Sequence, residues 1–175
     1  MTTKKMVLLS GLTAISIVLN WMENVFLPWT ILPVPGVRIG LANVVFLTVL
    51  LIAGFKIALT LSILRVIILA LLTGTFATVV FPISLGGAIS SILVMKLVCF
   101  LFQQRISVIG ISITGAVGHN LGQLAVLSMF PQLFPGLSVI YVFLPFLLLL
   151  SIPTGIITGW ITKQILSTVQ QEWNY

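Results

Sequence analysis

The sequence predicts an all-α polytopic membrane protein built as one domain over residues 1–175. The first reason is composition. Of the residues, 59% are hydrophobic and 6% are charged, and the mean hydropathy is +1.29, whereas a soluble domain carries about 25% charged residues. The second reason is length, because a transmembrane helix needs about 20 apolar residues and the chain holds six such segments. The third reason is the placement of the basic residues, most of which fall on one side of such a bundle.

The first three transmembrane helices are expected at roughly 6–27, 37–53 and 55–73. The first segment has the basic start and apolar run of a signal peptide. No cleavage site of small residues precedes Glu23, so we expect the segment to be retained as a helix. The turn-rich stretch PWTILPVPG separates it from the second segment, which is the shortest of the six, and GFK separates the second from the third.

The last three transmembrane helices are expected at roughly 79–103, 106–130 and 138–166. They follow the turn sequences TGTF, QQR and PQLFPG. Pro145 and Pro153 fall inside the last segment. We expect them to kink that helix, since neighbouring helices in a membrane can satisfy the freed backbone groups.

The basic residues predict the orientation of the bundle. Six spans place both termini on one side, and the basic residues on that side are Lys4, Lys5, Lys56, Arg105 and Lys163. Arg38 falls at the opposite ends of the helices. The positive-inside rule therefore places both termini in the cytoplasm. The net charge of +6 is then a signal of topology in a bacterial plasma membrane, and no nucleic-acid partner is expected.

The stretch GAVGHNLGQ, residues 115–123, places polar side chains inside an apolar segment. At 100° per residue, His119, Asn120 and Gln123 form one polar stripe on a helix. Gly118 and Gly122 form a GxxxG pair beside it, which allows another helix to approach closely.

Other polar residues are expected at a similar membrane depth, and together they predict a binding site. The expected substrate-binding residues are Glu23, Arg38, Asn43, Arg65, His119, Asn120 and Gln123. Ionisable residues at this depth cost about 2.5–3.5 kcal/mol each and usually mark a ligand or ion pathway. Because arginine grips carboxylates and phosphates, we expect an outward-facing cavity for a small anionic or amphiphilic molecule. The alternative is a structural role, as an ion pair and interhelical hydrogen bonds.

Ser10 and Ala14 predict a second surface on the first helix. They lie four residues apart, and Glu23 lies on the other side of the helix, 180° from Ala14 at 100° per residue. If Glu23 faces the cavity, the small pair faces outward and suits docking of a helix from another membrane protein. Packing inside the same bundle and an ordinary lipid-facing turn are the alternatives.

Several classes of enzyme are disfavoured by missing residue types. The two acidic residues are both glutamates, whereas a prenyl diphosphate synthase needs clustered aspartates to hold Mg²⁺ through oxygen ligands. There is no GxxxxGK[ST] phosphate-binding loop, and one His and one Cys cannot build a typical zinc site. We therefore expect no enzymatic activity, metal or cofactor, and powered transport would need a separate ATPase.

Four stretches resemble one bacterial family in order along the chain: VPGVRIGLANVV (34–45), GFKIALTLSILRVII (54–68), SLGGAISSILVMKL (84–97) and GAVGHNLGQL (115–124). That family is described both as Gx transporters and as heptaprenyl diphosphate synthase component I. The synthase description conflicts with the absence of aspartate and can refer at most to an accessory role.

The hydropathy plan also resembles the substrate-binding S components of energy-coupling factor (ECF) transporters. This resemblance implies a six-helix bundle that binds a small molecule near the outer face, under a lid formed here by residues 28–37. It implies docking onto a transmembrane coupling protein driven by two ATPase subunits. Ser10 and Ala14 match the position of the docking motif, with Ser in place of the usual first Ala.

Three functions remain open at this stage. The first is a transporter substrate-binding subunit. The second is a non-catalytic membrane accessory of isoprenoid, heptaprenyl diphosphate or quinone metabolism. The third is a free-standing or proton-coupled carrier that uses Glu23 and His119.

Overall fold

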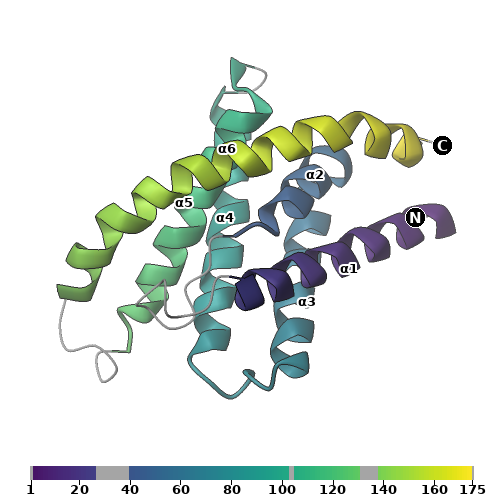
Figure 1. Cartoon of the computed structure of the whole chain (residues 1–175). Helices are drawn as coiled ribbons and strands as arrows, with labels where there is room; N and C mark the ends of the chain where they lie inside the picture. Colours follow the sequence, from purple (N-terminus) through teal and green to yellow (C-terminus); the bar gives the residue numbers. More distant parts are fainter. Residues whose placement is uncertain (1, 27–39, 103–104, 131–137, 175) are drawn as a thin grey trace.

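The computed structural model describes residues 2–26, 40–102, 105–130 and 138–174. Over these residues the regular structure consists of α-helices, drawn in Figure 1. The helices are α1 (Thr3–Phe26), α2 (Asn43–Ala53), α3 (Phe55–Leu72), α4 (Val80–Phe102), α5 (Val108–Leu127) and α6 (Ser138–Asn174). The predicted all-α class is confirmed, and each of the six expected segments overlaps one of these helices.

Two helices differ most from their predicted bounds, and the ends of the other four lie within three residues of the predicted ones. Residues 40–42 precede α2 as a turn that opens at Gly40, whose φ is +91°, so the helical part of the second segment is shorter than expected. In contrast, α6 continues past residue 166 to Asn174. Its added turns contact the start of α1, where Lys4 forms an ion pair with Glu172 at 3.4 Å.

The protein is membrane-embedded, as the length and hydropathy of its helices show. Among the described residues, four helices are long and apolar enough to cross a bilayer: α1, α3, α4 and α6. At 11 residues, α2 is about 16 Å long, which is about half of the hydrocarbon thickness. At 20 residues, α5 is not among these four, and it contains the polar residues His119, Asn120 and Gln123. The number of spans and the side on which the termini lie stay predictions.

Close packing of α5 against α4 and α6 organises one half of the molecule (Figure 1). A side chain at Gly118 would meet Val94, and one at Gly122 would meet Ser90 and the carbonyl group of Gly86. The expected close approach at the GxxxG pair is therefore made by α4. On the other side, the hydroxyl groups of Ser112 and Thr158 share a 2.7 Å hydrogen bond between α5 and α6.

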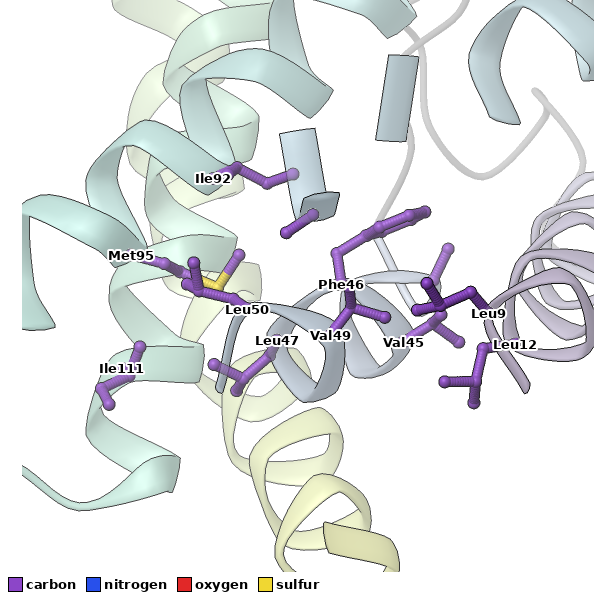
Figure 2. Close-up of a cluster of buried hydrophobic side chains, with 12 residues drawn as sticks. Leu9, Leu12, Val45, Phe46, Leu47, Val49, Leu50, Ile92, Met95 and Ile111 are labelled. Carbon is purple, nitrogen blue, oxygen red and sulfur yellow. The ribbon is translucent and has the colours of Figure 1, made fainter. Parts of the chain in front are cut away.

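The short helix α2 lies at the centre of the hydrophobic core. Every residue from Asn43 to Leu50 is buried, as expected for a helix that is apolar on all sides. Figure 2 shows its side chains facing Leu9 and Leu12 of α1 in one direction, and Ile92 and Met95 of α4 in another. This central position brings the start of α2 into contact with polar residues from the helices around it.

Candidate functional site

A hydrogen bond between Glu23 and Gly40 joins the end of α1 to the turn before α2. The backbone N–H of Gly40 donates to Oε1 of Glu23 over 2.6 Å, and the bond is buried. A carboxylate acceptor makes such a bond stronger than a neutral one. Since φ of Gly40 is +91° and an added Cβ would lie 3.0 Å from Nδ2 of Asn43, this position is suited to glycine.

The imidazole of His119 lies between two glycine backbones. A Cβ atom at Gly40 would lie 3.3 Å from Cδ2 of His119, and a Cβ atom at Gly87 of α4 would lie 3.0 Å from Cε1. The same atom at Gly87 would lie 2.7 Å from Cγ of Gln123. The absence of side chains at both glycines therefore makes room for the ring between the start of α2 and α4.

These contacts gather four of the predicted site residues, which we call the polar cluster: Glu23, Asn43, His119 and Gln123. They come from α1, α2 and α5, and all four are buried. Buried polar groups normally find hydrogen-bond partners, yet among the described residues Nδ2 of Asn43 makes no hydrogen bond. An amide donor of this kind is available to a bound polar molecule.

Asn120, which the sequence places on the same stripe, has partners on a different helix. Its Nδ2 donates to the carbonyl oxygen of Leu147 over 3.0 Å and to the hydroxyl of Ser151 over 2.8 Å. Because neighbouring residues on a helix point about 100° apart, Asn120 faces α6 while His119 faces α2 and α4. The observed role of Asn120 is to hold α5 against α6.

Arg65 lies beside α2, one turn further along that helix than the polar cluster. Its guanidinium carbon is 4.9 Å from the centroid of the Phe46 ring, within the range of a cation–π interaction. Phe46 and Asn43 are three residues apart and therefore share a face of α2. Arg65 is buried. Because burying a charged side chain in a membrane protein is costly, its presence here indicates a functional role such as ligand binding. Arg38 lies outside the described residues.

Two residues that contribute to the site were not among those predicted from the sequence. They are Gly40 and Gly87, which shape the space around His119. Five polar residues in this region each have an interaction partner: Asn20, Glu23, Arg65, His119 and Gln123. Nothing in the sequence indicated that these two glycines belong to the site, because it does not reveal which backbone segments the imidazole ring of His119 packs against.

Ser10 and Ala14 lie away from the polar cluster. Both are exposed, whereas Glu23 is buried. They line a groove between α1 and α3. As for metals, no group of three or more His, Cys, Asp or Glu side chains suited to an ion occurs within the described parts of the chain.

Comparison with known proteins gives one family assignment. No curated protein and no solved structure matches the sequence. The family described as heptaprenyl diphosphate synthase component I matches residues 12–165. This match begins in α1, ends in α6 and includes the described residues of the polar cluster. The chain therefore belongs to the heptaprenyl diphosphate synthase component I family.

Proposed function

We propose that the protein is the substrate-binding subunit of an energy-coupling factor type importer in the bacterial plasma membrane. The observation that carries this proposal is the polar cluster, in which three helices bring buried polar side chains to the start of α2. In membrane proteins such groups mark ligand or ion pathways. Sequence reasoning supports six spans with both termini in the cytoplasm, an arrangement that puts this cluster in the outer half of the membrane.

The proposed ligand is a small anionic or amphiphilic molecule. Arg65 is buried beside α2, and its guanidinium group suits a carboxylate or phosphate group. The amide groups of Asn43 and Gln123 and the imidazole of His119 offer hydrogen bonds that could orient the rest of the molecule. Arg38 and Asn120 also belong to the substrate-binding residues predicted from the sequence. Asn120 supports the site by holding α5 against α6.

The proposed partners are a transmembrane coupling protein and two ATPase subunits, with lipid around the assembly. Ser10 and Ala14 are exposed on α1, where small side chains allow another helix to approach. The subunit itself is proposed to be non-catalytic and free of cofactors. Its two acidic side chains are already engaged, Glu23 with Gly40 and Glu172 with Lys4.

A second candidate function is favoured by the description of the family, which names a component of a heptaprenyl diphosphate synthase. In that case the protein is a non-catalytic membrane accessory of isoprenoid or quinone metabolism. The two functions predict different partners, because the importer needs ATPases and the accessory needs a prenyl synthase.

Co-purification separates these functions. Tagged protein is extracted gently from its native membrane, and the proteins that remain bound are identified by mass spectrometry. Recovery of a transmembrane coupling protein with two ATPases supports the importer. Recovery of a prenyl synthase without ATPases contradicts it and supports the accessory. Recovery of neither, together with transport by the purified protein alone, contradicts both.

A further inference from the structure

A groove with a volume of about 600 Å³ lies between α1 and α3. In Figure 1, α1 runs obliquely across α3. The groove is lined by Met6, Leu9, Ser10, Thr13, Ala14 and Ile17 of α1, and by Lys56, Ile57, Thr60, Leu61, Leu64 and Ile68 of α3. No residue of the polar cluster lines it, so it is separate from that cluster.

A second hollow of about 280 Å³ continues this groove along α3. Ile17 lines both hollows, and the second is bounded on α3 by Leu69, Leu72 and Thr73. Together the two hollows extend from the first turn of α3 to the residue that caps its end. At 1.5 Å per residue this is about 27 Å, close to the roughly 30 Å thickness of the hydrocarbon core.

Of the three hydroxyl-bearing residues that line the groove, Thr13 and Thr60 bond to their own helices. The Thr13 hydroxyl donates to the carbonyl oxygen of Leu9 over 2.8 Å. The Thr60 hydroxyl donates to the carbonyl oxygen of Lys56 over 3.0 Å. Both hydroxyl groups are thus satisfied by their own helices, and the charged group that lines the groove is the Lys56 ammonium at one end.

The charge at this end has no counter-ion within the described protein. Lys56 is exposed and forms no ion pair with another described residue. Glu172 is engaged by Lys4 at 3.4 Å, and Glu23 is buried against Gly40. These are the two acidic side chains of the chain, and neither pairs with Lys56, so an anionic group of the membrane can lie beside it.

We propose that the α1–α3 groove binds an anionic phospholipid, with an acyl chain along the groove and the phosphate beside Lys56. An apolar channel with a cation at one end matches the layout of such a lipid. In the free protein, the lipid phosphate supplies the anion that Lys56 lacks among the described residues. The lipid is the occupant of the free protein, and a coupling protein that docks on Ser10 and Ala14 has to displace it.

Photo-crosslinking tests this site with the purified protein alone in lipid nanodiscs. The probes are phosphatidylglycerol and phosphatidylcholine with a diazirine on the acyl chain, and mass spectrometry maps the labelled residues. Phosphatidylglycerol is expected to label the groove, at residues such as Ile17 and Leu64, more strongly than phosphatidylcholine. Lys56→Gln is expected to reduce this labelling about fivefold, because one lysine strengthens binding to an anionic membrane surface by about this factor. Lys163→Gln, at an exposed lysine of α6, is the matched control and leaves the labelling unchanged.

A second variant tests the groove without altering charge. Thr60 is exposed, and Thr60→Trp fills the groove from the α3 side, so labelling of Ile17 is expected to fall. Three results would overturn the proposal. The first is that both lipids label the groove equally and Lys56→Gln does not change this labelling. The second is that labelling spreads evenly over exposed residues such as Phe100 and Leu149. The third is that the groove crosslinks to a second copy of the chain in place of lipid.

Discussion

The backbone N–H of Gly40 donates a 2.6 Å hydrogen bond to the carboxylate of Glu23, seventeen residues earlier in the chain. This bond fixes the turn before α2 to the end of α1 inside the protein. It also explains how one of two acidic residues in the chain is accommodated in an apolar interior. The start of α2, and with it the polar cluster, depends on this contact.

Glu23→Ala is expected to destabilise the protein. Hydrogen bonds to charged groups contribute about 1.5–3 kcal/mol, so the midpoint of thermal unfolding in detergent falls clearly. Glu23→Gln retains an acceptor oxygen and is expected to lose only part of this stability. Equal midpoints for wild type and both variants would show that the Glu23–Gly40 bond does not support the fold.

Gly87→Ala is expected to impair ligand retention with little change in helix content. The added Cβ would lie 3.0 Å from Cε1 of His119 and 2.7 Å from Cγ of Gln123, so both side chains have to move. Mass spectrometry of the small molecules held by the purified protein measures the effect. The control is Gly11→Ala, where the new Cβ meets nothing within 4 Å. If the two variants retain equal amounts, Gly87 does not shape the site.

Asn120→Ala is expected to weaken the contact between α5 and α6. The side chain makes two hydrogen bonds to α6, and an interhelical hydrogen bond in a membrane protein contributes about 0.6 kcal/mol on average. The free energy of unfolding should therefore fall by about 1 kcal/mol, as measured by denaturation in detergent. Ser128→Ala, at an exposed serine of the same half of the molecule, should leave it unchanged. Loss of ligand without loss of stability in Asn120→Ala would instead favour direct contact with the ligand.

Ala14→Trp is expected to reduce co-purification of the proposed coupling protein while ligand retention stays normal. The indole group fills the part of the α1–α3 groove that Ser10 and Ala14 line. The matched control is Ile15→Trp, because Ile15 is exposed on the same turn and does not line that groove. Unchanged co-purification of the coupling protein with Ala14→Trp would remove the docking role of this surface.

The sequence was sufficient to predict the helices and the polar cluster for a shared physical reason. Apolar segments mark the helices, and polar residues within them are costly enough to be conspicuous. The rotation of each helix about its axis is set by packing, however, so Asn120 could not be distinguished from His119. The exceptional backbone of Gly40 and the extension of α6 to Asn174 depend on contacts with Glu23 and Lys4 that are distant in sequence.

The central claim is that a small anionic or amphiphilic molecule binds at the polar cluster and depends on Arg65. The most direct test is mass spectrometry of the small molecules retained by wild type, Arg65→Ala and Arg105→Ala after gentle extraction from the native membrane. Arg65 is buried against Phe46, whereas Arg105 is exposed and serves as the control. The account predicts an anionic or amphiphilic molecule in wild type and Arg105→Ala, and its loss in Arg65→Ala while the protein still inserts in the membrane. Equal retention of that molecule in all three proteins would contradict the account.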